Sequence, residues 1–269
     1  AFGEAHHWSM KVLGRVAVNT YQGLLKALVT WTDTLLPLIC CRLQETKGNR
    51  VRRKAKEAMH PVTPQIWITL TWHMGMQMPW SRRSGPSHSS ERDHFGQMLK
   101  EQQFPQNTLF CADAGFIGYD LWKGIIDHGH SFLIRVGANV RLLRKLGYVR
   151  ECDGIVYCWP DSAARKKQPP LVLRLLHFKL GKCDVYSVTN VLSQKQVSDK
   201  QSIKLYLCRW GVELQFRTMK QTFGRRKLRS KTPHRALVEL VWSVLGLWMI
   251  QLFAVKEQIE IGKVPEHCS

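Results

Sequence analysis

Negatively charged residues are scarce in this chain of 269 residues. It has 20 aspartates and glutamates against 40 lysines and arginines, which gives a formal net charge of +20. This imbalance favours a polyanion as the partner, most often nucleic acid, over an anionic membrane surface. The sequence also lacks internal repeats and low-complexity segments, and its hydrophobic fraction of 44% is ordinary for a globular protein. A mainly disordered, collagen-like or coiled-coil chain is therefore excluded.

Several chemical motifs are missing as well. None of the eight cysteines forms a CxxC pair, and most lie in apolar runs, which is typical of reduced thiols in a cytosolic protein. No glycine-rich phosphate loop and no serine–histidine–aspartate grouping stands out, so neither nucleotide use nor acyl chemistry is indicated. Residues 1–7 have no signal-peptide pattern, and the missing initiator methionine indicates a fragment or a processed start.

Only one segment, Leu237–Val255, is apolar and long enough to span a membrane. Glu239 and Gln251 interrupt it, and a charged side chain is costly in lipid. We therefore expect this segment to be a buried helix of a larger domain, and we expect no membrane partner. The helix should begin at Thr232–His234, with a proline in its first turn.

The first 56 residues are the hardest to interpret. Gly14–Val18 and Ala27–Thr32 are strand-like, whereas Thr34–Leu43 is apolar without a clear period. The basic run Lys47–Lys56 predicts either a loop or tail with affinity for phosphate, or a solvated surface loop.

From residue 65 onward the periodicity is clearer. It predicts strands at 65–73, 76–85, 108–112 and 131–136, and helices at 91–103, 119–128 and 199–220. Short apolar runs divided by glycine, proline and charged residues predict an antiparallel β region over 139–192. The fold class is therefore α/β, with an inserted antiparallel β subdomain. We expect the divisions 1–46 with a possible first core strand, 47–138 first core part, 139–192 insertion, 193–257 helical core part and 258–269 tail.

Asp113 is the first candidate for chemistry. It follows the buried strand 108–112, and the carboxyl ends of strands are where α/β proteins place their sites. Gly115 allows a tight turn directly after it. The alternative role for Asp113 is an ordinary turn residue or helix cap.

The second candidate is one face of the predicted helix over 199–220. At helical spacing, Tyr206, Arg209, Glu213 and Lys220 share this face. An ordinary ion pair between positions i and i+4 would also explain Arg209 and Glu213. The basic residues that follow this helix favour a DNA contact, and they are Arg225, Arg226, Lys227 and Arg229.

These residues carry a resemblance to a known family. The spacing Tyr206-x2-Arg209-x3-Glu213-x6-Lys220 matches the Y-R-E-K signature of bacterial insertion-sequence DDE transposases of the insertion-sequence-four family. Ala112–Phe116 resembles the region of that family's second catalytic aspartate. The likeness extends over Lys56 to about Val255, including PWSRRSGPSHSSER, FLIRVGANVRLL and KQTFGRRKLRS.

The resemblance implies a ribonuclease-H-like fold and metal-dependent DNA strand cleavage and transfer at insertion-sequence ends. It implies that three carboxylates hold two Mg²⁺ ions, for which Mn²⁺ can substitute, with Asp113 and Glu213 as the second and third acids. It further implies that Tyr206, Arg209 and Lys220 grip DNA near the cleaved end. The implied partners are transposon ends and target DNA, bound by a homodimer in the bacterial cytoplasm at the nucleoid. A degenerate transposase that only binds DNA is the alternative.

The first acid is the point where the chain departs from the family pattern. The family places an Asp-Gly-Ser/Thr-like turn after an early strand, and no Asp-Gly occurs before Asp113. Asp33 follows the strand-like run Ala27–Thr32. It is preferred as the catalytic and metal-binding first acid because it is charged. Asn19 is its rival. A third possibility is that the first acid has been lost, because residues 1–46 resemble the family poorly. The family also extends further at both ends, so we expect the chain to be truncated.

Overall fold

The computed structural model describes most of the chain after residue 65 and one earlier strand, of which it gives the backbone alone. The described ranges are 36–44, 66–74, 77–86, 89–101, 104–105, 107–137, 148–224, 228–229 and 232–263. The expected features at Gly14–Val18, Ala27–Thr32 and Lys47–Lys56 lie outside these ranges.

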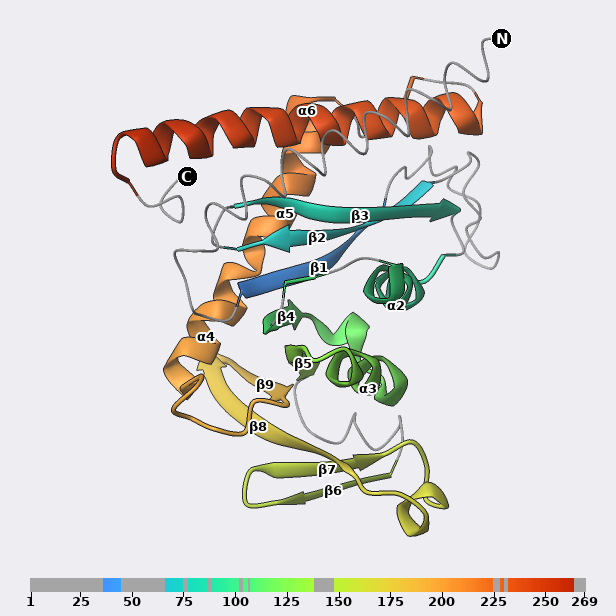
Figure 1. The fold of residues 1–269 in the computed structure, drawn as a ribbon, viewed down its shortest axis with the longest axis vertical. Helices are drawn as coiled ribbons and strands as arrows, with labels where there is room; N and C mark the ends of the chain where they lie inside the picture. The colour runs from blue at the N-terminus through green and yellow to red at the C-terminus, as the bar shows by residue number, and fades with distance from the viewer. Residues whose placement is uncertain are drawn as a thin grey trace.

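One mixed sheet joins all the strands of the described part, in the order β3-β2-β1-β4-β5-β9-β8-β7-β6 (Figure 1). The strands are β1 Leu36–Gln44, β2 Ile66–His73, β3 Met78–Pro86, β4 Thr108–Ala112, β5 Ser131–Gly137, β6 Tyr148–Cys152, β7 Ile155–Trp159, β8 Leu171–Leu180 and β9 Cys183–Thr189. β1, β4 and β5 are parallel, and β2 and β3 extend the β1 side as an antiparallel pair. Three antiparallel strands followed by two parallel crossovers form the ribonuclease-H-like order that the resemblance implies.

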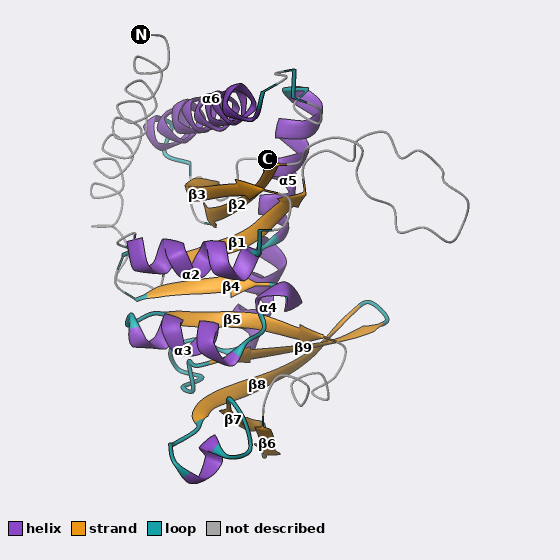
Figure 2. Cartoon of the chain, turned by 90° about the vertical axis from the view of Figure 1, so that its right-hand side faces the viewer, coloured by secondary structure: helices purple, strands orange, loops and turns teal. Residues whose placement is uncertain are grey.

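Helices cover both faces of this sheet. They are α2 Glu91–Glu101, α3 Tyr119–Asp127, α4 Asp199–Cys208, α5 Trp210–Arg217 and α6 Pro233–Glu260, with 3-10 turns at Ala114–Phe116 and Ala164–Lys166 and a π-turn at Thr218–Thr222. Figure 2 shows α2 and α3 on one face of the sheet and α4 and α5 on the other. A hydrophobic core lies on each face of the sheet. Alternate residues of β4 pack into one core or the other, because side chains alternate along a strand. Leu109 and Cys111 pack on the α5 side, and Phe110 and Ala112 on the α2–α3 side.

The strands predicted at 65–73, 76–85, 108–112 and 131–136 are confirmed as β2, β3, β4 and β5. The helices predicted from Glu91 and from Tyr119 are confirmed as α2 and α3. Thr34–Leu43, which showed no clear period, contains β1. β1 need not alternate, because helices contact it from both faces of the sheet, α2 from one and α5 from the other.

The region 139–192 contains the predicted antiparallel strands. β6, β7, β8 and β9 pair in sequence, and β9 pairs antiparallel with β5. The β-rich region therefore extends the core sheet edge to edge. The division of the chain at 139 and 192 stays a prediction.

The prediction of one continuous, regular helix over 199–220 is wrong. α4 ends at Cys208, α5 begins at Trp210, and a π-turn follows at Thr218–Thr222. At the break, the Arg209 amide donates to the Tyr206 carbonyl and the Val212 amide to the Arg209 carbonyl, both at 3.2 Å. Bonds that span three residues tighten the helix locally, while Arg209 itself keeps helical dihedral angles (φ −52°, ψ −30°).

The expectation of a buried helix at Leu237–Val255 is only partly met. α6 buries Leu240, Val244 and Leu247, yet Trp242 is 52% and Phe253 64% exposed. Among the described residues α6 is the one helix long and apolar enough to cross a membrane, and 28% of its apolar window is buried. Figure 1 shows why: α6 lies along the β3 rim of the molecule, so only one side of it meets the core.

Candidate active site

Asp113 stands at the carboxyl end of β4, as predicted, and begins a 3-10 turn. Its Oδ1 accepts a hydrogen bond of 2.9 Å from the Gly115 amide. The cap role considered for this residue is therefore present in the structure. Its side chain is half-buried at the rim of the sheet, which leaves the second carboxylate oxygen available for other contacts.

Gly115 keeps this turn close to α2. A Cβ added at Gly115 would lie 3.0 Å from Asp113 Oδ1 and 3.3 Å from Glu91 Oε2. The carboxylates of Asp113 and Glu91 thus border the same glycine. Sequence reasoning missed Glu91, which it took only as the first residue of a helix, because their proximity depends on how α2 packs against the turn.

The position of α5 depends on Gly211. A Cβ at this residue would overlap the indole ring of Trp72, which is fully buried in β2. Trp72 pairs with Ile39 of β1, and Ile39 pairs with Cys111 of β4. Trp72 and Cys111 therefore lie on the same face of the sheet, two strands or about 10 Å apart. The start of α5 packs on this face. Cys111 precedes Asp113 by two residues.

Arg209 and Glu213 form the ion pair that their spacing allows. Arg209 Nη1 donates to Glu213 Oε1 at 3.1 Å. The Arg209 side chain is 8% exposed and that of Glu213 41%. The Arg209 guanidinium also lies 5.6 Å from the ring centre of Tyr206 and 5.8 Å from that of Trp210. Glu213 is thus held by a buried cation while it remains open to solvent.

Tyr206 is a core residue in this structure. It is 2% exposed and packs edge to face against Phe178 at 5.9 Å. The π-turn carries Lys220, which is half-buried. A π-turn inside a helical run often marks a functional site. The predicted DNA contacts of Tyr206, Arg209 and Lys220 stay predictions.

The remaining predicted site residues divide into two groups. Asp33, Asn19, Arg225, Arg226 and Lys227 lie outside the described residues. Arg229 is exposed, and its backbone amide donates to both carboxylate oxygens of Glu239 at 3.1 and 3.0 Å. That contact joins the basic segment to the start of α6.

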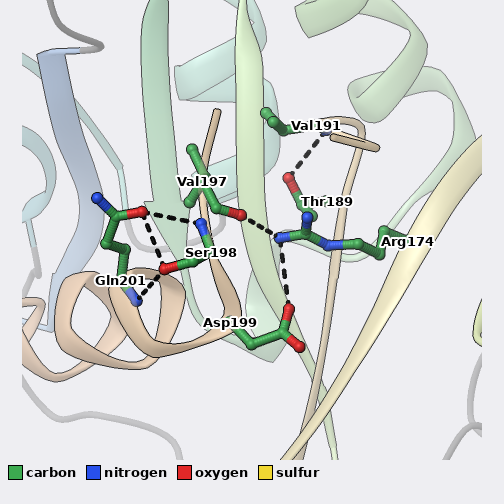
Figure 3. Close-up of polar contacts among 7 residues, drawn as sticks. All are labelled: Arg174, Thr189, Val191, Val197, Ser198, Asp199 and Gln201. Carbon is green, nitrogen blue, oxygen red and sulfur yellow. Dashed lines mark hydrogen bonds and ion pairs between the residues drawn. The ribbon is translucent and has the colours of Figure 1, made fainter. Parts of the chain in front are cut away.

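The start of α4 is fixed to the β-rich region by Arg174 of β8 (Figure 3). Arg174 is 6% exposed; its Nη2 donates to the Val197 carbonyl at 2.7 Å and lies 3.7 Å from Asp199 Oδ1. Ser198 and Gln201 close a reciprocal capping box at the same point. The helical run that carries Glu213 is therefore anchored at its first turn.

The resemblance implies a site for two metal ions, which needs three carboxylates. In the ranges that the structure describes, no three His, Cys, Asp or Glu side chains come together as a metal site. Asp113 and Glu213 are two oxygen donors of the kind that hard divalent ions prefer. The candidates for the first acid, Asp33 and Asn19, lie outside the described residues, so the structure describes two of the three implied ligands.

The chain resembles known transposases. Residues 75–249, more than half of the chain, match the family described as the transposase DDE domain. The chain is 29% identical over 192 residues to the transposase InsG for insertion sequence element IS4 of Escherichia coli (strain K12), which covers 68% of this chain and 42% of that protein.

A solved structure with a similar fold is the piggyBac transposase synaptic complex with hairpin DNA. Its TM-score is 0.52 at 11% identity, over 86% of this chain and 49% of that chain. This likeness supports the fold alone. The chain spans less than half the length of both relatives.

The sheet has the ribonuclease-H-like order, and Asp113 stands at the carboxyl end of its parallel strand β4. The match over 75–249 shows that the chain belongs to the DDE transposase family, whose members are DNA cleavage and transfer enzymes that depend on divalent metal.

Proposed function

We propose that this chain carries out DNA strand cleavage and strand transfer at the ends of an insertion sequence. The observation that carries the proposal is the position of Glu213. It lies on a helix packed over the sheet face that leads to Asp113, and the buried Arg209 holds it while 41% of its side chain stays exposed.

The proposed roles follow from the chemistry of each residue. Asp113 and Glu213 supply two carboxylates, and Mg²⁺ is the proposed ion, with Mn²⁺ as a substitute, because carboxylate oxygens suit hard cations. Arg209 offers a planar fork of donors that suits either a carboxylate or a phosphate. In the free chain it binds Glu213, and near a DNA end it takes a phosphate oxygen together with Lys220.

The proposed partner is duplex DNA, as insertion-sequence ends and as target. The excess of positive charge supports this proposal. Assembly as a homodimer on DNA would supply one site for each of two ends. The proposed location is the bacterial cytoplasm, at the nucleoid.

The test is a gel shift beside a cleavage assay, with duplex DNA that carries the inverted repeat flanking this reading frame. Arg209→Ala is expected to weaken binding of the cleaved end, because a phosphate contact is lost. Glu213→Gln is expected to spare binding and to abolish whatever cutting the parent shows, because the amide keeps the shape without the charge. Arg209→Lys is the matched control, which keeps the charge and loses the fork.

If Arg209 and Glu213 form only a structural pair, the two substitutions act alike through a small loss of stability. Equal binding and equal cutting by both variants and the parent would refute the role of this helix. A duplex with a scrambled repeat separates end recognition from general affinity for DNA.

A further inference from the structure

One side of α6 carries a contiguous row of exposed apolar residues. Trp242 is 52%, Met249 51%, Ile250 58% and Phe253 64% exposed. Their helical spacing places them on one side of α6, opposite the side that packs on the core. A contiguous exposed apolar patch marks an interaction surface, whereas single exposed apolar residues are ordinary. We call these four residues, together with Gly246 between them, the α6 stripe.

Gly246 lies in the middle of the α6 stripe and leaves room for a second helix. A Cβ added at this position would meet nothing within 4 Å. Packing inside the chain therefore does not require glycine here, although glycine destabilises a helix interior relative to alanine. The distance between two packed helices depends on the side chains at their contact, so a glycine there permits a close approach.

An antiparallel pair of α6 helices matches the apolar residues of the stripe. When Trp242 of one copy lies opposite Phe253 of the other, the same register sets Gly246 opposite Met249, so a small residue faces a large one. A two-fold axis then relates the copies, and each match occurs twice, as in the closed interface of a symmetric dimer. The α6 stripe therefore fits an antiparallel copy of itself.

The charged residues at the two ends of α6 fit the same register. Arg235 lies two helical turns before Trp242, and Glu260 lies two turns after Phe253, so Arg235 of one copy stands opposite Glu260 of the other. Arg235 and Glu260 are both exposed. Two copies of a chain with a net charge of +20 repel each other, and this register matches opposite charges where the copies meet. Glu260 also lies 3.6 Å from Lys256 in its own helix, and such an exposed pair is readily exchanged.

A lipid surface is the other partner that an apolar helix could meet, since α6 is long and apolar enough to cross a membrane. One side of α6 is already used, because Leu240, Val244 and Leu247 pack in the core. Glu257 and Glu260 are exposed at the end of the helix, and an anionic membrane surface repels carboxylates. The charges therefore favour a second copy of the chain over a membrane.

We infer that the α6 stripe is a self-association surface, through which two copies of the chain pack α6 against α6 in antiparallel orientation, with the two-fold axis beside Gly246. The inference deepens the proposed function, because it gives the proposed homodimer a surface. It also states that this contact forms without DNA. Its test therefore needs no DNA, and its failure is distinct from a failure of DNA binding or cleavage.

Sedimentation equilibrium of the full chain, without DNA and at physiological salt, is the first measurement. The average mass of the parent is expected to rise from 31.1 kDa towards twice that value as the concentration increases from about 1 to 100 µM. Phe253→Asp is expected to weaken the dimer by about tenfold or more, because it places a charge in the apolar contact. Leu192→Asp is the matched control, since Leu192 is 47% exposed outside α6 and the charge change is the same.

The second measurement tests the antiparallel register. Arg235→Glu and Glu260→Arg are each expected to weaken self-association, because each sets like charges opposite each other at both ends of the pair. An equal mixture of the two variants is expected to associate as tightly as the parent, since the copies then match at both ends with opposite charges. Both positions are exposed, so these variants should fold, and circular dichroism checks that they do.

Three results would overturn the inference. The first is the mass of a single copy over the whole concentration range. The second is a dimer that Phe253→Asp leaves as tight as Leu192→Asp does. The third is a pair of charge variants whose mixture associates no better than each variant alone.

Lipid binding is measured with vesicles of phosphatidylcholine and phosphatidylglycerol. Binding of a monomeric chain that Phe253→Asp removes would assign the α6 stripe to a membrane instead. A monomer that still binds and cuts the end duplex would refute the α6 contact and leave the proposed function standing.

Discussion

The two faces of the sheet are built in different ways. Two regular helices, α2 and α3, cover one face, whereas the helical run on the other face breaks at Arg209 and ends in a π-turn. The regular face is filled with packed aromatic rings, such as Phe95 against Phe110 at 4.9 Å and Trp122 against Phe132 at 5.6 Å. The irregular face carries the buried Arg209 and the exposed carboxylate of Glu213.

This difference indicates a division of labour. Both faces bury an apolar core, but the irregular face also holds the charged pair Arg209–Glu213. Substitutions at packed residues of either face should therefore change the free energy of unfolding, whereas those at Arg209 and Glu213 should change DNA handling more than stability.

Trp122→Ala should have the largest effect on stability. Trp122 is 1% exposed, and its indole N–H donates to the Phe116 carbonyl at 3.1 Å. Removing a buried aromatic ring leaves a cavity, and we expect a loss of about 3–5 kcal/mol in the free energy of unfolding. Urea denaturation measures it. A loss below about 1 kcal/mol would show that this face does not carry the stability.

Acid should destabilise the fold through His73. Burial lowers the pKa of His73 to about 4, an effect that a backbone hydrogen bond partly offsets. The unfolded chain takes up the proton first, so stability is full above about pH 6.5 and falls as the pH drops towards 4, by about 3 kcal/mol at most.

Urea midpoints between pH 7 and 4, compared for the parent and His73→Gln, measure this contribution. The variant should lose less stability over that window. Parallel pH profiles for the two proteins would contradict a neutral, buried His73.

Gly211→Ala should be harmful where Gly124→Ala is not. A Cβ at Gly211 meets the Trp72 ring, whereas one at Gly124 of α3 meets nothing within 4 Å. Overpacking at Gly211 should cost about 1–3 kcal/mol. Alanine at Gly124 should stabilise the protein by up to about 1 kcal/mol, because it is the better helix former. Thermal unfolding of both variants tests the pair, and a neutral Gly211→Ala would mean that α5 does not press on Trp72.

The smallest expected change is at an exposed ion pair on the regular face. Lys123 Nζ lies 2.8 Å from the Asp127 carboxylate, one helical turn away in α3, and both side chains are about half exposed. Solvent screens such pairs, so Lys123→Ala should leave the urea midpoint almost unchanged. Chemical denaturation at low and high salt checks this, and a clear loss of stability that shrinks at high salt would show that the surface pair contributes more than its exposure allows.

The sequence predicted the regular part of the fold well, because periodicity reports burial. β2, β4, β5, α2 and α3 follow directly from alternation, helical spacing and caps. The break at Arg209 was not predicted, since a helical wheel assumes uniform geometry and cannot show that Gly211 is pressed against Trp72. β1 was not recognised either, because an interior strand shows no alternation.

The candidate site could be predicted only in part for the same reason. Asp113 at a strand end and the Arg209–Glu213 pair depend on local spacing, and both were found. The proximity of Glu91 to Gly115 depends on how α2 packs against the turn that follows β4. Asp33 was preferred over Asn19 because it is charged, and both residues lie outside the described part of the chain, so this choice stays a prediction.

The most direct test is a crystal structure of this chain bound to the inverted-repeat duplex and Mn²⁺, with the ion located by anomalous scattering. The account predicts an anomalous peak held by Asp113 and Glu213, at the carboxyl end of β4. An ion held elsewhere, or carboxylates of Asp113 and Glu213 on opposite faces of the sheet, would contradict it.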